Sequence, residues 1–558
     1  MPNHSVAQSF TTAGEHSTLV TILRLSTAFG TSEIYITCLP DAWIGINIQH
    51  RRRRILLLVM LNSLTVLSVF ASGEFSGASG CLCTYGNPCW PDAAIFSQLE
   101  SQVSQPLIYP IPTASACYPA SNPSGNCSEV IQNWTDGNWR SSIPGSMDAP
   151  NFESFVFKNG TISACYLNTS LGVPCEQGTV PVIGVDARTP ADIQAAVNFA
   201  IQYNLKLVVK NTGLVKVSSS PNHRDLDGGS RHDFLGRSAA RGAFIVWTHN
   251  MKNITYDATF APQGAPSNET YEGSAFSCHH CAPMVTQLAI FTAVVTLGAG
   301  VQWYEAYYAV NQYGRMMVGG ITPGGSIGAA GGWLQGGGHS VLSPTYGLGM
   351  VISTVLLPCL SGYCDPGVDN AIEITVVTPT GEYLTVNDYQ YSDLFWALRG
   401  GGGGTYGVVT SVTYRTYESL PVASYFFQAN VTNTTIVNGL ATRMLQLQAN
   451  LTDDGWGGFG YLSNISMSFV AIAPNMSTEA ANASIQPWTE YVQSQDISSV
   501  AEILPIPSWY EWYSGLFNTS GGNGLNLMIT TRLLSRNTTA NKFKEIAELL
   551  IDCGGQFM

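Results

Sequence analysis

The sequence predicts an α+β protein with two lobes, and three observations support this fold class. The chain has 558 residues, more than a single hydrophobic core usually spans. Hydrophobic residues make up 45% of the chain and charged residues 11%, which favours a packed globule over a coiled coil or a disordered chain. From residue 180 onward, short apolar segments alternate with amphipathic helical segments and turn signals.

The first lobe is predicted to begin with a strand, a helix and a second strand. Residues 180–187 and 205–213 are apolar runs of strand length, and the segment between them has helical periodicity. Thr189 and Pro190 are typical of a helix start, and Asp192 lies near the positive end of the helix dipole. Further strands, with one amphipathic helix, are predicted within residues 242–257, 293–314 and 371–387.

The second lobe follows from about residue 420. A strand is predicted at 424–432, a helix at 435–451 and more strands within 458–474, which indicates a second sheet. Several aromatic residues of this lobe could contact a ligand or belong to its core. They are Trp456, Tyr461, Trp509, Tyr510, Trp512 and Tyr513.

The N-terminal region contains a segment typical of secretory signals. Residues 1–50 have no clear periodicity and carry no structural prediction. Residues 51–75 comprise four arginines, an apolar stretch and a small-residue end, which is the order found in signal peptides. The apolar stretch is shorter than the roughly 20 residues of a membrane span. We therefore predict a secreted, extracellular protein, with a membrane anchor in the secretory pathway as the alternative.

Residues 76–177 form a cysteine-rich segment. Such crowding is typical of disulfide-bonded proteins in an oxidising compartment. The cysteines are Cys81, Cys83, Cys89, Cys117, Cys127, Cys165 and Cys175. Their pairing is open, and zinc ligation is the alternative, although histidines at ligand spacing are absent there.

Sequons for N-glycosylation are dense downstream of the signal segment. This density does not fit a cytosolic chain and supports the secretory pathway. The sequons begin at Asn126, Asn133, Asn159, Asn168, Asn253, Asn268, Asn430, Asn433, Asn450, Asn464, Asn475, Asn482, Asn518 and Asn537.

Three glycine-containing segments are candidates for binding a phosphate-bearing cofactor. They are residues 210–213 with 232–238, residues 324–340 and residues 393–410. Glycines let main-chain N–H groups approach a pyrophosphate closely. Each motif alone is weak, since tight turns within a core have the same composition. A Rossmann NAD site is disfavoured, because the first strand–helix junction contains no glycines.

Together these segments resemble the vanillyl-alcohol-oxidase-type, or PCMH-type, FAD-binding fold, and in particular the fungal berberine bridge enzyme-like FAD-linked oxidoreductases. The similarity covers roughly residues 180–417. It implies a two-subdomain FAD-binding domain at 178–418. It also implies a partial α/β substrate domain with an antiparallel sheet at 419–558, truncated at its C-terminal end.

The resemblance implies that FAD is bonded to His232. In the family, a strand ends in a loop whose histidine is bonded to the 8α-methyl carbon of the flavin, and KNTG with HDFLGRS supplies that loop here. The segment 324–339 would wrap the pyrophosphate and flavin, and 393–410 would pack near the adenine. His249 is expected to be structural, and no metal is expected. The residues implied to bind the cofactor are His232, Lys210, Asn211, Thr212, Gly213, Asp233, Gly236, Arg237, Ser238, Gly324, Ser326, Gly328, Gly331, Gly332, Gly338, His339, Gly407 and Val408.

The chain departs from the family pattern in several places. Gly324 stands where many relatives have a second flavin-bonding cysteine, so a single covalent link is expected. Residues 214–231 separate Gly213 from His232, and residues 274–292, which contain CHHC, interrupt a second region. We hypothesise that both segments are gene-prediction artefacts, and CHHC lacks the second ligand pair of a zinc site. The catalytic base is unassigned, because the matching C-terminal segment is missing.

The function implied by the resemblance is that of a secreted FAD-dependent oxidase. It would transfer a hydride from a small-molecule alcohol, sugar or secondary metabolite to FAD, with O2 as the acceptor. The net charge of −13 excludes a nucleic-acid partner, since binding to phosphate backbones requires a basic surface. The alternative is a non-catalytic secreted glycoprotein derived from this fold by truncation. The sequence indicates no oligomeric state.

Overall fold

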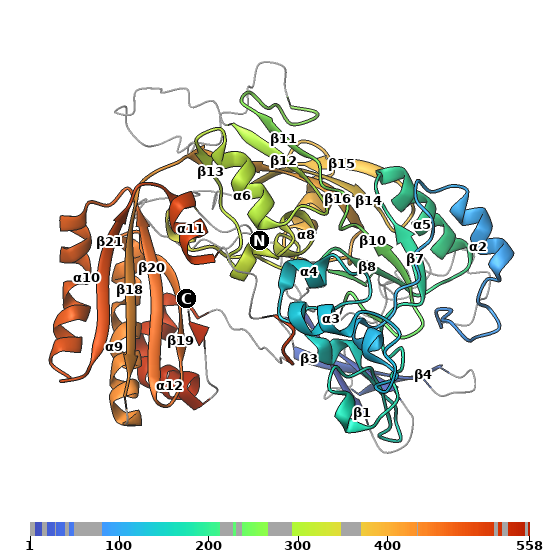
Figure 1. Ribbon diagram of the computed structural model, residues 1–558, viewed down its shortest axis with the longest axis horizontal. Coiled ribbons are helices and arrows are strands. Elements are labelled where there is room, and N and C mark those ends of the chain that lie inside the picture. The colour runs from blue at the N-terminus through green and yellow to red at the C-terminus, as the bar shows by residue number, and fades with distance from the viewer. Residues whose placement is uncertain are drawn as a thin grey trace. The chain divides into compact units, whose positions relative to one another are not determined.

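The computed structural model describes two compact units, residues 1–81 and 82–558 (Figure 1). In the first unit it describes the backbone of four strands: β1 (Val6–Ala13), β2 (Leu19–Thr27), β3 (Gly30–Cys38) and β4 (Ile44–Gln49). They form an antiparallel sheet in the order β1-β2-β3-β4, which the sequence did not predict. The signal segment 51–75 lies outside the described residues.

Beyond these strands, the structure describes residue 81 of the first unit and, in the second unit, residues 82–212, 237–265, 293–346, 370–431, 433–517, 523–526 and 534–552, with the backbone of 227–229 and 556–557. None of the helices in these ranges is long and apolar enough to cross a membrane. Within the same ranges, no group of histidine, cysteine or carboxylate side chains is arranged to hold a metal ion.

The cysteine-rich segment folds into short helices joined by loops. The helices are α2 (Ala93–Glu100), α3 (Cys127–Asn133) and α4 (Gly137–Ser141), with 3₁₀ turns at Thr113–Cys117, Pro150–Glu153 and Thr169–Leu171 and a small hairpin of β5 (Phe155–Val156) and β6 (Ile162–Ser163). Disulfides join Cys83 to Cys89, Cys117 to Cys127 and Cys165 to Cys175. The predicted disulfide bonding is thus confirmed, and each pair is local in the sequence.

The first sheet of the unit is parallel and has the order β7-β10-β8-β9. Its strands are β7 (Ile183–Asp186), β8 (Leu207–Lys210), β9 (Asp227–Gly229) and β10 (Phe244–Trp247). β7, β8 and β10 are buried along their whole length, as expected for a parallel sheet covered on both faces. The predicted strand–helix–strand order is confirmed, but β10 lies between the two predicted strands.

Helix α5 (Pro190–Gln202) connects β7 to β8, and local sequence explains its start. Thr189 Oγ1 accepts a hydrogen bond from the Asp192 backbone N–H, and the Asp192 carboxylate accepts one from the Thr189 N–H, which makes a capping box. Phe96 of α2, Phe199 of α5 and Phe244 of β10 pack together in the core beneath this sheet.

The second sheet is antiparallel and has the order β11-β12-β16-β14-β15. Its strands are β11 (Ile254–Asp257), β12 (Val294–Gly298), β14 (Ala371–Val377), β15 (Tyr383–Asn387) and β16 (Val408–Arg415). The same stretch of chain also contains α6 (Trp303–Asn311), α7 (Ser343–Tyr346), α8 (Ser392–Leu398) and the antiparallel pair of β13 (Arg315–Met316) and β17 (Tyr417–Glu418). Helix α8 occupies the start of the glycine-containing segment 393–410.

The third sheet is also antiparallel, with the order β21-β18-β20-β19-β22. Its strands are β18 (Val422–Asn430), β19 (Gly457–Leu462), β20 (Ser466–Pro474), β21 (Ser499–Ile506) and β22 (Gln556–Phe557). Helices α9 (Thr434–Asp453), α10 (Thr478–Gln493) and α12 (Arg536–Asp552) share one core with alternate residues of β18, such as Tyr425 and Phe427. Helix α11 (Trp509–Phe517) contacts Ser424 through Trp512, whose Nε1 donates to Ser424 Oγ at 2.9 Å. The mixed α+β fold is confirmed.

Candidate functional site

The first part of the site is the strand-end segment, residues 210–212, at the carboxyl end of β8. Lys210 is fully buried, and its Nζ donates a hydrogen bond to the Ile143 carbonyl at 3.0 Å. Asn211 Nδ2 donates to the Ala299 carbonyl. Asn211 Oδ1 and Thr212 Oγ1 are buried and have no hydrogen-bond partner in the described part of the chain. Since ligands of α/β sheets bind outside the carboxyl ends of parallel strands, these atoms are well placed for a ligand.

The second part is the glycine turn, residues 324–326. Gly324 and Gly325 have φ angles of +65° and +59°, a left-handed conformation that favours glycine. A Cβ on Gly325 would overlap Tyr513 Oη and lie 2.7 Å from Tyr304 Cβ. Ser326 is buried, and its Oγ has no hydrogen-bond partner within the described ranges. The turn therefore presents a third buried polar atom, next to a glycine at which the backbone and its neighbours leave no room for a larger residue.

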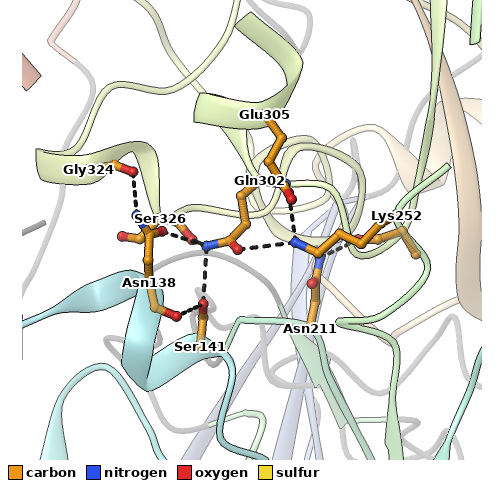
Figure 2. A network of polar contacts seen from close by, with 9 residues as sticks. Asn138, Ser141, Asn211, Lys252, Gln302, Glu305, Gly324 and Ser326 are labelled. Carbon is orange, nitrogen blue, oxygen red and sulfur yellow. Dashed lines mark hydrogen bonds and ion pairs between the residues drawn. The ribbon is translucent and has the colours of Figure 1, made fainter. Parts of the chain in front are cut away.

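Gln302 connects the glycine turn to helix α4 in a buried polar network (Figure 2). Its Nε2 lies 2.8 Å from the Ser326 carbonyl, 3.0 Å from Asn138 Oδ1 and 3.1 Å from Ser141 Oγ. Asn138 Nδ2 in turn donates to the Gly324 carbonyl at 2.8 Å. Two side chains from different parts of the sequence thus hold both ends of the turn.

Lys252 and Glu305 extend this network toward the strand-end segment (Figure 2). Lys252 Nζ donates to Glu305 Oε2 at 2.6 Å and to Gln302 Oε1 at 3.2 Å. Burial lowers the pKa of Lys252, while the Glu305 carboxylate opposes this shift. Glu305 Oε2 also accepts a hydrogen bond from the Gln302 backbone N–H at 2.8 Å, so it caps α6 as well.

The segment that follows the glycine turn packs onto the second sheet. Gly328 forms a bridge with Gln302, and Gly331 and Gly332 lie in the π-helical turn Ala329–Trp333. A Cβ on Gly338 would overlap the Trp333 ring. Trp333 Nε1 donates to the His339 carbonyl at 3.1 Å, while the His339 side chain is exposed.

A third glycine-rich segment, residues 402–404, is joined by hydrogen bonds to Gln335 and Arg237. Gly402 N–H donates to the Gln335 carbonyl at 2.8 Å, and Gly404 N–H donates to Gln335 Oε1 at 3.3 Å. Arg237 Nη1 donates to the Gly403 carbonyl at 3.0 Å. The segments 237–238, 324–340 and 393–410, which lie far apart in the sequence, are therefore brought together.

The predicted residues differ in what they offer to a ligand. Asn211, Thr212 and Ser326 present buried polar atoms. Val408 is a core residue at the start of β16. Gly407 is packed closely, since a Cβ there would lie 2.6 Å from the Val377 carbonyl oxygen. The predicted residues that lie outside the described ranges are Gly213, His232, Asp233 and Gly236, so the attachment to His232 stays a prediction.

The chain is similar to fungal flavoproteins along most of its length. It is 33% identical over 493 residues to an uncharacterized FAD-linked oxidoreductase of Arthroderma benhamiae, covering 85% of this chain and 73% of that protein. It is 29% identical over 440 residues to the VAO-type flavoprotein oxidase VAO615 of Thermothelomyces thermophilus, covering 77% and 63%. The crystal structure of the VAO-type flavoprotein MtVAO615 from Myceliophthora thermophila C1 matches with a TM-score of 0.66 and 26% identity, covering 85% of this chain and 75% of that one. The chain matches no protein-family model.

The chain belongs to the FAD-linked oxidoreductases. Its fold is that of the VAO-type flavoproteins, as predicted. The chain is therefore a member of an enzyme family, and its cofactor is FAD. The predictions of an enzyme and of FAD are both confirmed.

The residues of this FAD-linked oxidoreductase fit the cofactor. Buried polar atoms rarely lack partners in folded proteins. Asn211 Oδ1, Thr212 Oγ1 and Ser326 Oγ, which have no partner among the described residues, are hydrogen-bonding atoms of the kind that a dinucleotide requires. The glycine turn adds main chain that carries no Cβ. FAD would thus be held by the strand-end segment and the glycine turn.

Several residues of the site were not predicted from the sequence. Asn138 and Ser141 belong to the cysteine-rich segment, for which only disulfides were predicted, and Gln302 and Lys252 lie outside the glycine motifs. A signal for one of them exists: Gln302 and Glu305 have the spacing of a capping box. No local pattern indicates that Asn138 contacts Gly324, which is 186 residues away.

Proposed function

We propose that this chain is a secreted FAD-dependent oxidase that removes a hydride from a small-molecule alcohol, sugar or secondary metabolite. We further propose that O2 is the acceptor and that FAD is attached through a single covalent bond to His232. The observation that carries this proposal is that the strand-end segment and the glycine turn, which the Lys252–Gln302 network links, both present buried polar atoms without a hydrogen-bond partner among the residues that the structure describes. The boundaries 178–418 and 419–558 for the cofactor and substrate domains belong to the same proposal.

The chemistry would be divided between cofactor and protein. When bound, FAD supplies the hydride acceptor and passes the electrons to O2, which gives hydrogen peroxide. The protein holds the cofactor: Gln302 and Asn138 fix the glycine turn, and Lys210 and Lys252 supply positive charge near the strand ends. Preorganised cations and hydrogen-bond donors of this kind stabilise developing negative charge.

Two observations support the choice of reaction and substrate class. A relative that is 29% identical is named a VAO-type flavoprotein oxidase, which favours O2 as acceptor. Of the aromatic residues noted in the second lobe, Trp456, Trp509, Trp512 and Tyr513 are buried and belong to the core. Tyr461 of β19 is 56% exposed and is thus better able to stack on a substrate ring.

Secretion is supported by the disulfides and by the accessibility of the sequons. Three disulfides in one segment are typical of proteins that fold in an oxidising compartment. All described sequon asparagines are exposed except Asn133, which is partly buried. Asn268 and Asn518 lie outside the described residues.

The test is the visible spectrum of the secreted protein after acid precipitation, with His232→Ala beside it. We expect yellow colour to stay with the wild-type pellet and to move to the supernatant, or disappear, in His232→Ala. Peroxide release during a screen of alcohols and sugars would then identify the substrate. Colour that stays in the pellet of His232→Ala would place the bond elsewhere. A colourless wild type that binds no added FAD would favour the non-catalytic glycoprotein.

A further inference from the structure

His249 lies at the same sheet edge as the strand-end segment. It follows β10, which lies between β7 and β8 in the parallel sheet. The preceding residue, Thr248, donates its backbone N–H to the Lys210 carbonyl at 2.8 Å, so the two strand ends are directly adjacent. The carboxyl edge of such a sheet is where cofactors bind.

This edge contains an unusual group of buried polar atoms. His249 is 7% exposed, and its Nδ1 has no hydrogen-bond partner among the described residues. Trp247 Nε1, Asn211 Oδ1 and Thr212 Oγ1 are in the same situation. Because buried polar atoms are nearly always paired, four such atoms on neighbouring strand ends point to a ligand rather than to a packing defect.

The His249 ring is held in one orientation. It stacks on Trp247 with a centroid distance of 5.4 Å and an interplanar angle of 8°. Trp247 pairs with Asp186 of β7 and Lys210 of β8, and Lys210 Nζ lies 5.8 Å from the Trp247 ring centroid. On the backbone side, a Cβ on Gly300 would overlap the His249 carbonyl. A ring fixed in this way is preorganised for a directed hydrogen bond.

The charges around His249 favour a neutral ring. Burial, together with the positive charges of Lys252, Lys210 and Arg188, lowers the pKa of His249 to about 2. Two of these cations are also in ion pairs: Arg188 Nη2 lies 2.6 Å from Asp186 Oδ2, and Lys252 Nζ lies 2.6 Å from Glu305 Oε2. A neutral imidazole has one N–H donor and one acceptor nitrogen, so it can bond to a polar group of a ligand without carrying charge.

We propose that His249 Nδ1 makes a hydrogen bond to FAD at the carboxyl edge of the first sheet, and that Trp247 holds the imidazole ring in place. This assignment differs from the structural role expected from the sequence. It rests on the proposed function, since it requires FAD at this edge. His249 would thus act together with Asn211 and Thr212 in holding the cofactor.

The test compares His249→Phe with His249→Asn in the full-length secreted protein. Phenylalanine keeps the stack on Trp247 and removes both ring nitrogens, whereas asparagine keeps a hydrogen-bonding atom near the position of Nδ1. Flavin content is measured as the ratio of flavin to protein absorbance, before and after acid precipitation. FAD affinity is measured by fluorescence titration in the His232→Ala background, and the melting temperature is recorded for each variant.

We expect His249→Phe to weaken FAD binding about tenfold, as the loss of one buried hydrogen bond to a ligand predicts, and to lower the flavin content. His249→Asn is expected to retain most of both. Flavin content and affinity in His249→Phe equal to those of its parent would overturn the proposal. The proposal would also be overturned if both variants lost the same amount of flavin and the same melting temperature, because His249 would then have a structural role.

Trp456→Phe is the matched control. It removes a buried ring nitrogen just before β19, where Trp456 Nε1 donates to Ser484 Oγ of α10 at 3.1 Å. We expect a lower melting temperature with unchanged flavin content. If wild-type protein binds no FAD at all, the proposed function fails. If wild type binds FAD and His249→Phe binds it equally, only the inference about His249 fails.

Discussion

At the residue scale, the glycine turn depends on the absence of a side chain at Gly325. Its φ of +59° would cost an alanine about 1–2 kcal/mol. A methyl group there would also overlap Tyr513 Oη. Tyr513 stacks on Trp509 with an interplanar angle of 6° and packs edge-on to Tyr307, so it has little room to withdraw.

We therefore expect Gly325→Ala to lower both the melting temperature and the flavin content of the secreted protein. Gly314→Ala is the control, because Gly314 has a similar φ of +65° and nothing within 4 Å of the added Cβ. It should show only the backbone cost of about 1–2 kcal/mol and keep its flavin. Equal losses in the two variants would show that the contact with Tyr513 is unimportant.

At the scale of elements, the cysteine-rich segment supports the cofactor site through α4. Arg140 at the end of α4 is buried and donates to Glu153 Oε1 at 2.9 Å, and the Met147 N–H donates to the same oxygen at 2.8 Å. These bonds hold the loop that contains Ile143, whose carbonyl accepts the hydrogen bond from Lys210. Burial raises the pKa of Glu153, although Arg140 opposes this shift.

Helix α6 meets α4 through Gln302, so Gln302→Leu should break the bonds that join α6 to α4 and to the Ser326 carbonyl, leaving only Asn138 of these two side chains to hold the glycine turn. Leucine would leave Lys252, Asn138 and the Ser326 carbonyl short of a buried partner, and each such loss costs about 1–3 kcal/mol. We expect unfolding in urea to show a loss of about 2 kcal/mol or more, together with reduced flavin content.

The control for this change is Gln312→Leu at the other end of α6. Gln312 is exposed, and its Nε2 donates to the Tyr308 carbonyl one turn earlier in the same helix. Surface changes of this kind usually alter stability by less than about 0.5 kcal/mol. A Gln302 variant as stable and as yellow as the Gln312 variant would exclude a role for the network in holding the turn.

At the scale of the whole molecule, the sequon asparagines and disulfides predict the state of the mature protein. Because almost all described sequon asparagines are exposed, their side chains are accessible to the glycosylation machinery. We expect treatment with an N-glycosidase to lower the apparent mass of the protein from a secretory host on a denaturing gel by the mass of several glycans. Protein that accumulates inside the cell without glycans would contradict the proposed secretion.

The local features of the fold were predictable because they depend on residues close in sequence. The β7–α5–β8 order follows from apolar periodicity and from the Thr189 capping box. In the second lobe, apolar periodicity also predicts the order of a strand, a helix and further strands. The glycine segments were also recognisable, since glycine at a strand end or a tight turn has a distinct backbone role.

The tertiary structure alone placed β10 between β7 and β8, and it joined Asn138 to Gly324 across 186 residues. It also showed which aromatic residues of the second lobe are core and that the His249 Nδ1 is buried without a partner in the described part of the chain. These features depend on strand order and on burial, which arise from packing between distant segments. Composition and periodicity report only whether a residue prefers the interior, whereas a binding site depends on which interior atoms remain unpaired.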